Sequence, residues 1–166
     1  MMENAEDIFQ RADEAGIRLE IVGGLPVWEA HPNLTHQEAI DRIRQTILPL
    51  PQSNGQACGG VHYADLHIKF PDGSDKRLDI SIFCRRPAES ESAVTEVPAA
   101  VIEVISRGYE AKDLQLGPPF YLSQGVKDVV VFDPYSQRVY LFDSAGQQEC
   151  LSPIKLELKC GCQLTA

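Results

Sequence analysis

The chain has 166 residues, of which 43% are hydrophobic and 23% are charged, the composition of one ordinary globular domain. Its formal net charge of −9 argues against non-specific binding to a phosphate backbone, although a local basic patch remains compatible with it. No apolar run approaches the roughly 18 residues of a membrane span, and no basic stretch followed by an apolar one marks a secretory signal. We therefore expect a cytoplasmic protein made of one domain, residues 1–166.

The chain contains five cysteines, an odd number at irregular spacing, which is typical of reduced thiols rather than of a disulfide framework. Cys160 and Cys162 are one residue closer together than the C-x₂-C pairs of zinc sites. Because the sequence places no second ligand pair near them, we do not expect zinc there.

In the N-terminal half, short helices and strands alternate. Residues 4–15 carry apolar residues at helical spacing, and residues 17–22 and 25–29 are predicted to be strands joined by a Gly-Gly turn. A capping-box pattern at Thr35 begins a helix that carries Ala39, Ile40, Ile43 and Ile47, and that Pro49 and Pro51 end. Two more strands, residues 61–70 and 76–83, are joined by a Pro-Asp-Gly turn, and an exposed loop is expected at 85–96.

The segment 97–134 organises the rest of the chain. Residues 98–105 and 129–132 are apolar on both alternating faces, as in parallel strands that are covered by helices on both sides. The connection between them is long enough for a helical crossover, which predicts a strand–helix–strand unit. Three short antiparallel strands are predicted to follow, at 138–143, 147–152 and 154–158. The fold class is therefore α/β.

Two carboxylates lie on predicted strands. Glu103 lies inside an apolar strand, where an unpaired carboxylate is costly, so it needs a cation, a metal or a hydrogen-bond network. Arg107 or Lys112 could supply that partner. Asp79 alternates with Leu78, Ile80 and Ile82, which are expected to share one face, and taken alone it is an ordinary strand residue.

If the two strands are neighbours, Asp79 and Glu103 can converge. Two carboxylates and a main-chain carbonyl form a hard-oxygen site that suits Mg²⁺ or Mn²⁺. Such an ion can activate water and stabilise charge on a phosphoryl group.

Six short pieces, by their order and spacing, carry a resemblance to a known family: LEIVGG at 19–24, HQ at 36–37, LDISI at 78–82, VP at 97–98, EVIS at 103–106, and Tyr121 through Gly125-Val126 to Phe132-Asp133-Pro134. In these pieces the chain resembles the Uma-type family of putative restriction endonucleases, within the PD-(D/E)xK nuclease superfamily. The resemblance covers nearly the whole sequence.

This resemblance implies a restriction-endonuclease-like fold, a central mixed β-sheet flanked by helices, and hydrolysis of phosphodiester bonds in nucleic acid. It implies Asp79 and Glu103 as catalytic residues that bind Mg²⁺ or Mn²⁺, with the main-chain carbonyl of Ile105. Glu20 and His36 would be accessory residues near that site. DNA is expected as the partner more than RNA, and a homodimer is expected.

The lysine of the family motif is missing. The superfamily often has lysine two residues after the glutamate, where this chain has Ile105, and the family's own lysine position falls on Gly117. Pro118 and Pro119 follow, and proline disfavours all but the first turn of a helix. Lys112 is the nearest substitute, and we assign it as the candidate electrophile.

Two other functional classes remain open. The absent lysine and the acidic charge favour a nuclease-fold protein that has lost catalysis and acts as a binding or regulatory module. In the other class, the acidic residues are only structural.

Overall fold

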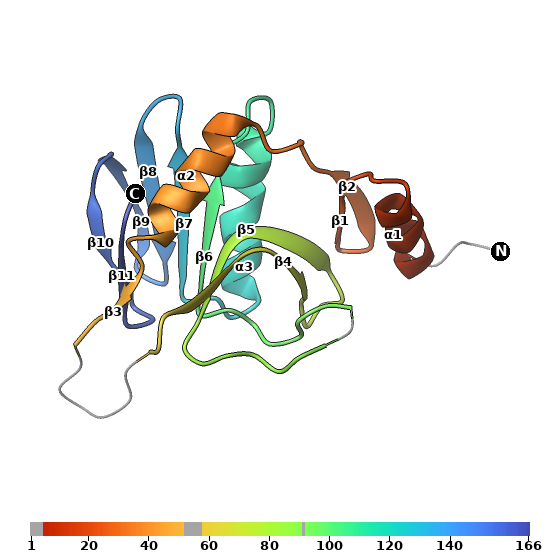
Figure 1. Ribbon diagram of the computed structural model, residues 1–166, viewed down its shortest axis with the longest axis horizontal. Helices are drawn as coiled ribbons and strands as arrows, with labels where there is room; N and C mark the ends of the chain where they lie inside the picture. Colours follow the sequence, from red (N-terminus) through yellow and green to blue (C-terminus); the bar gives the residue numbers. More distant parts are fainter. Residues whose placement is uncertain (1–4, 52–57, 91) are drawn as a thin grey trace.

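A computed structural model describes residues 5–51, 58–90 and 92–166 of the chain (Figure 1). Within this part, the α-helices are α1 (Ala5–Glu14), α2 (Leu34–Arg44) and α3 (Gly117–Ser123), and a π-helix, η1 (Lys112–Leu116), directly precedes α3. The strands are β1 (Leu19–Val22), β2 (Leu25–Trp28), β3 (Leu48–Pro49), β4 (Val61–Lys69), β5 (Asp75–Phe83), β6 (Ala100–Val104), β7 (Asp128–Asp133), β8 (Arg138–Asp143), β9 (Gly146–Leu151), β10 (Lys155–Glu157) and β11 (Cys162–Thr165). No helix in these ranges is long and apolar enough to cross a membrane.

The larger sheet has the strand order β2-β1-β5-β6-β7-β8-β9, and β4 also pairs with β5. Strands β6 and β7 are parallel, whereas β5 and β6 are antiparallel. The predicted strand–helix–strand unit and the mixed α/β sheet are thereby confirmed. Strands β10, β11 and β3 form a separate antiparallel sheet.

The sheet lies between two helices, and each side has its own apolar core (Figure 1). On one side, Ile40 and Ile43 of α2 pack with Ile102 of β6 and with the small sheet. On the other side, Tyr121 of α3 packs with Val101 of the same strand. Strand β6 is buried on both faces, as its apolar residues on either side of Glu103 predict for a central strand.

Some local predictions are wrong. The N-cap of α2 is Asn33, whose side chain accepts a hydrogen bond from His36 N–H, instead of Thr35. The helix ends at Arg44, so Ile47 is buried outside it. Leu78 packs in the Tyr121 core, whereas Ile80 and Ile82 pack in the α2 core.

The predicted exposed loop is anchored near its end, because Ala93 is buried and Val94 N–H donates to the His67 carbonyl. The short strands β3 and β11 were not predicted.

A disulfide joins Cys58 and Cys84. The prediction of reduced thiols is therefore wrong for this pair, whereas Cys150, Cys160 and Cys162 are free. The pairing of β4 with β5 places Val61 opposite Phe83. Cys58, just before β4, and Cys84, just after β5, are thereby brought together. Sequence spacing does not contain that information.

Candidate active site

Strands β5 and β6 bring Asp79 and Glu103 together. The strands are antiparallel with Ile80 opposite Ile102, and the same register places Asp79 opposite Glu103 one residue further along. Asp79 N–H donates to Glu103 Oε2 at 3.3 Å, and Val104 N–H donates to Asp79 Oδ2 at 2.8 Å. The two carboxylates thus meet where β6 ends.

Glu103 is enclosed by its neighbours, with 8% of its surface exposed. The Tyr121 hydroxyl donates a hydrogen bond to Glu103 Oε1. Burial, and then the charge of Asp79, raise the pKa of Glu103 well above its ordinary value. Glu103 therefore holds a proton readily, and a cation bound beside it would relieve its repulsion with Asp79.

His36 reaches Asp79 from α2. Its Nε2 lies 3.1 Å from Asp79 Oδ2, and its buried Nδ1 has no hydrogen-bond partner among the described residues. Burial lowers the pKa of His36, but the hydrogen bond and charge of Asp79 outweigh it, so that the net pKa is raised. His36 thus orients Asp79.

Glu20 belongs to an adjacent buried cluster and is 1% exposed. Its Oε2 lies 3.2 Å from Lys76 Nζ and 3.0 Å from Lys112 Nζ. Burial raises the pKa of Glu20, but the two ammonium groups lower it by more than burial raises it. The net pKa of Glu20 is therefore below its ordinary value. Glu20 therefore stays ionised as the anchor of two lysines.

The π-helix places Lys112 in the site. Gly117 N–H donates to the Lys112 carbonyl, so the helical path continues from η1 into α3. Pro118 and Pro119 lie in the first turn of α3, the part of a helix that tolerates proline. The prolines therefore do not prevent a helix, and the chain ahead of them carries Lys112 to Glu20 and Glu29.

A small pocket of about 30 Å³ opens beside the paired carboxylates. Asp79, Glu103, His36 and Lys112 line it, and so does Asp113, which was not predicted as a site residue. Volume of this size accommodates one or two water-sized groups.

Ile105 does not line this pocket, although its neighbours Val104 and Ser106 do. The Ile105 side chain packs in the Tyr121 core, and its N–H donates to the Phe132 carbonyl.

Two further acids in the pocket have strongly shifted pKa values. Burial, and then the charge of Glu20, raise the pKa of Glu29 to about 7. Burial raises the pKa of Asp113 to about 7 as well; Lys112 opposes this shift, and Asp79 adds to it. Both residues are isolated acids in the sequence, and only the tertiary fold shows that they share one pocket.

The partners that the sequence suggested for Glu103 are engaged elsewhere. The Arg107 guanidinium lies 4.4 Å from the centre of the Tyr135 ring, and Lys112 pairs with Glu20 and Glu29. Glu103 instead receives its hydrogen bonds from the Tyr121 hydroxyl and the Asp79 N–H.

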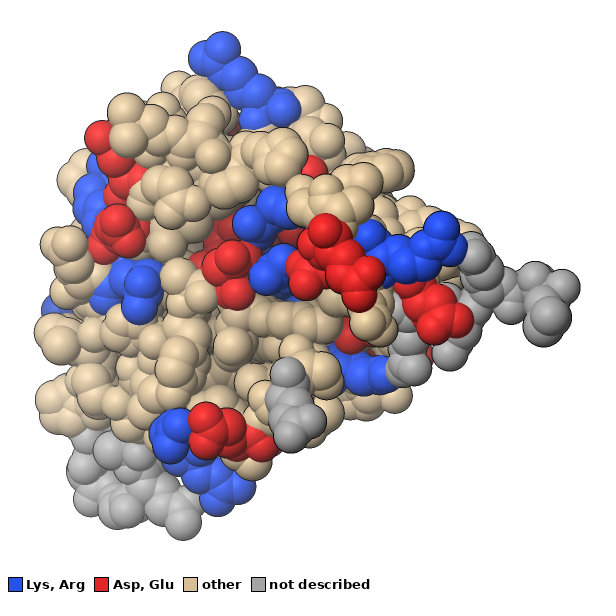
Figure 2. All heavy atoms as spheres, turned by 45° about the vertical axis from the view of Figure 1, so that its right-hand side comes forward, with Lys and Arg blue, Asp and Glu red and all other residues tan. Residues whose placement is uncertain are grey.

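The donor set fits a hard divalent cation. Two carboxylates meet at a small polar pocket, and carboxylate oxygens are the ligands that Mg²⁺ and Mn²⁺ prefer. On the face shown in Figure 2, Lys and Arg side chains (blue) lie beside Asp and Glu side chains (red) across the middle of the molecule. The charges on this face are therefore paired rather than gathered into a broad basic surface.

Comparisons with known proteins agree with this architecture. A family model described as "Putative restriction endonuclease" matches residues 5–159. A crystal structure of a putative nuclease from Anabaena variabilis is similar with a TM-score of 0.67 and 19% sequence identity, and the match covers 91% of this chain and 87% of that one. No curated protein matches the sequence.

The solved structure shows that the chain has the restriction-endonuclease-like fold, and the family match spans nearly all of the sequence. The chain belongs to the Uma2 family of putative restriction endonucleases.

Proposed function

We propose that this chain acts as a single-domain, divalent-metal-dependent nuclease that hydrolyses phosphodiester bonds. The observation that carries the proposal is the convergence of Asp79 and Glu103 at one pocket, with Asp79 N–H donating to Glu103 Oε2. Family membership supports nucleic acid as the substrate class. DNA is preferred over RNA within this proposal, and a cytoplasmic homodimer is the expected form.

Asp79 and Glu103 are the proposed ligands of Mg²⁺ or Mn²⁺, and Ile105 does not belong to this set because it does not line the pocket. When bound, such an ion supplies an activated water and stabilises charge on the phosphoryl group. His36 holds Asp79 in position through the contact at its Oδ2. Tyr121 does the same for Glu103 through its hydroxyl group.

Lys112 is the proposed cation for the phosphate. Its Nζ lies 3.0 Å from Glu20 and 3.3 Å from Glu29, and the side chain is 19% exposed at the pocket wall. Burial lowers the pKa of Lys112, but Glu20 and Glu29 raise it more, so the amine is held charged. Glu20 therefore acts as a positioning residue.

One observation favours a second candidate function, a nuclease-fold module without catalysis. Lys112 Nζ is held by two carboxylates, and Gly117 occupies the position of the family's lysine. If those ion pairs persist when nucleic acid binds, the amine cannot reach a phosphate. Binding of nucleic acid or of a protein partner would then be the remaining function.

Cleavage assays separate the two candidates. Labelled double- and single-stranded DNA and RNA are incubated with the protein and Mg²⁺ or Mn²⁺. The nuclease proposal expects cleavage that Asp79→Asn and Glu103→Gln each reduce at least about 100-fold, and that an exposed control, Glu157→Gln, leaves unchanged. Absence of cleavage on every substrate contradicts the nuclease proposal, and activity that survives Asp79→Asn contradicts the assigned site.

A further inference from the structure

Four of the five cysteines meet at a place that is separate from the acidic pocket. Cys58 precedes β4, Cys84 follows β5, and Cys160 and Cys162 flank the turn between β10 and β11. The sulfur atoms of Cys58, Cys160 and Cys162 all lie within 4.8 Å of one another. Cys84 Sγ is bonded to Cys58, so the fourth sulfur belongs to the same cluster.

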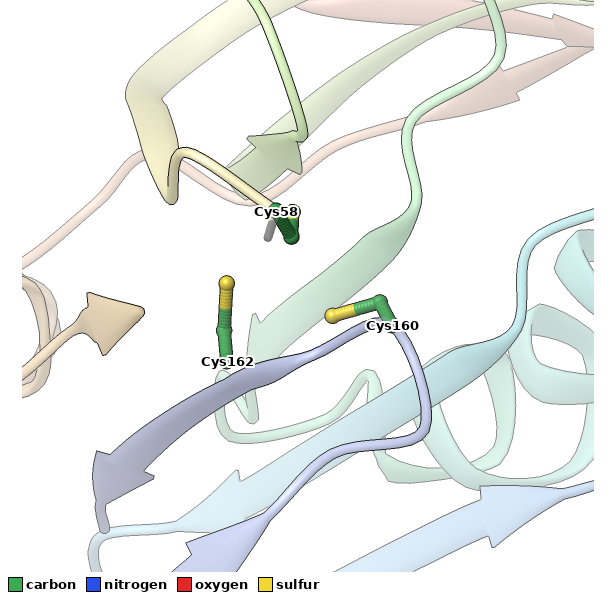
Figure 3. A group of neighbouring side chains, drawn as sticks. All are labelled: Cys58, Cys160 and Cys162. Atoms are coloured by element: carbon green, nitrogen blue, oxygen red, sulfur yellow. The ribbon is translucent and has the colours of Figure 1, made fainter. Parts of the chain in front are cut away.

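The side chains of Cys58, Cys160 and Cys162 face a common space. The Cys160 and Cys162 sulfurs point into the space beside Cys58 (Figure 3). Cys58, Cys160 and Cys162 are buried in the α2 core, whereas Cys84 is exposed. The cluster is thus enclosed by apolar packing and open on the side of Cys84.

The backbone next to Cys58 is built for close approach. A Cβ atom on Gly59 would lie 2.8 Å from the Cys84 carbonyl oxygen, which real structures do not tolerate. A Cβ atom on Gly60 would lie 3.5 Å from Cys162 Sγ, and the φ of Gly60 is +63°, a conformation that favours glycine. The Gly59-Gly60 pair therefore lets Cys58 lie against both Cys84 and Cys162.

The turn that carries the other two cysteines is also fixed. Gly161 has a φ of +99°, and its N–H donates to the Leu158 carbonyl. The fully buried Asp128 carboxylate accepts hydrogen bonds from Lys159 N–H at 2.9 Å and from Cys160 N–H at 2.8 Å. These bonds fix the backbone at Cys160, whose sulfur lies within 4.8 Å of the Cys162 sulfur.

We propose that, once the Cys58–Cys84 bond is reduced, these four cysteines bind one zinc ion as a structural site. Zinc binds thiolates in tetrahedral geometry at about 2.3 Å, which places the sulfurs about 3.8 Å apart. The three sulfurs within 4.8 Å of one another are near that spacing without any movement of the backbone. A tetrahedral set of four thiolates selects zinc among the common divalent ions.

The chemistry balances with a dithiol as reductant. The dithiol gives two electrons to the Cys58–Cys84 bond, releases its two protons to solvent and becomes a disulfide itself, and the thiolates of Cys58 and Cys84 form. Zinc then displaces the remaining thiol protons of Cys160 and Cys162 into solvent.

The sequence spacing argued against zinc because Cys160 and Cys162 have no second pair nearby along the chain. The pairing of β4 with β5 supplies that pair.

Such a site would tether the small sheet to the large one. Cys160 and Cys162 border the small sheet, and Cys58 and Cys84 flank the paired strands β4 and β5. A zinc ion between them crosslinks the two sheets in reducing conditions, as the disulfide crosslinks only β4 and β5 in oxidising ones. This role is independent of the proposed nuclease site.

Metal content of the reduced protein tests the proposal. The protein is purified with a dithiol reductant, loaded with ZnSO₄ and desalted. Its zinc content is then measured by inductively coupled plasma mass spectrometry. We expect about one zinc per chain, and a loss of at least about tenfold in zinc affinity in Cys84→Ser and Cys162→Ser. Cys150→Ser is the matched control, because Cys150 is a free cysteine outside the cluster, and it should bind like the wild type.

Co²⁺ loading provides a readout that does not depend on stability. Four thiolate ligands give a sulfur-to-cobalt charge-transfer band in the absorption spectrum. Circular dichroism of the same samples confirms that each variant is folded. Cys84→Ser is the safest variant, since Cys84 is exposed. A reduced, folded wild-type protein that binds no zinc overturns the proposal. Zinc binding that survives both Cys84→Ser and Cys162→Ser overturns it equally.

Discussion

Lys112 Nζ lies 3.0 Å from Glu20 Oε2, and this contact joins the π-helix to a carboxylate that is almost fully buried. The contact explains how a chain without lysine at position 117 still has an ammonium group in the pocket. It also explains why the amine is not free, because Glu20 and Glu29 both hold it. In the proposed nuclease function, access of this amine to a phosphate depends on this arrangement.

Replacing Lys112 by Met should lower the free energy of unfolding by about 2 kcal/mol, because a buried carboxylate loses one of its two cations. Lys76 remains 3.2 Å from Glu20 and limits the loss. Urea denaturation at pH 7 measures the change, with Lys155→Met, at an exposed position of β10, as the control. Equal stabilities of the two variants would mean that the Glu20–Lys112 contact contributes nothing.

Tyr121→Phe should lower the free energy of unfolding by about 1–3 kcal/mol, because the buried Glu103 Oε1 loses its hydroxyl donor while the ring still fills the core. The measurement is chemical denaturation in EDTA, so that no divalent ion masks the effect. Tyr140→Phe is the control for loss of a hydroxyl at a partly buried ring. A Tyr121→Phe protein as stable as this control would contradict the role of Tyr121.

Glu29 should make the fold less stable as pH rises. Its pKa is about 7 in the folded protein against 4.5 as the ordinary value, so between these pH values the native state binds the extra proton. The free energy of unfolding should therefore fall by roughly 2–3 kcal/mol from pH 4.5 through pH 7 on account of this one group.

Glu29→Gln carries no titrating group at this position and should flatten that part of the profile. Denaturation of the metal-free protein at successive pH values measures the slope. Glu38→Gln, at an exposed position of α2, should leave the slope as in the wild type. Identical slopes for wild type and Glu29→Gln would show that Glu29 is not protonated in the fold.

Gly117→Lys should be tolerated and should raise the cleavage rate by about 100-fold, the effect expected for a positioned cation. An added Cβ would meet the Lys112 carbonyl oxygen at 3.4 Å and the Tyr121 ring at 3.5 Å, distances that need little movement. Gly117→Met, which has similar length without charge, is the control. If both variants cleave at the same rate, a lysine at this position does not supply the missing function.

Much of the fold could be predicted from the sequence because its signals are local. The apolar runs of β6 and β7 and the crossover between them predict parallel central strands, and the structure has them. The alternation in β5 places Asp79 opposite Glu103 only if the two strands are neighbours. That neighbour relation is a tertiary fact, which the family resemblance supplied.

The rest of the site could not be predicted, because its groups come together from distant segments. Glu29 follows β2 and Asp113 lies in a π-helix, and in the sequence both are ordinary acids. Their pKa values near 7 arise from burial in a shared pocket. The prediction of reduced cysteines was wrong for the same reason, since the pairing of β4 with β5 brings Cys58 and Cys84 together from distant segments.

The most direct test of the account is calorimetric titration of the protein with Mg²⁺ and Mn²⁺. We expect binding by the wild type and by the control Glu157→Gln, and loss of that binding in the double variant Asp79→Asn, Glu103→Gln. Binding that is absent from the wild type, or that persists unchanged in the double variant, would contradict the claim that Asp79 and Glu103 form a metal site.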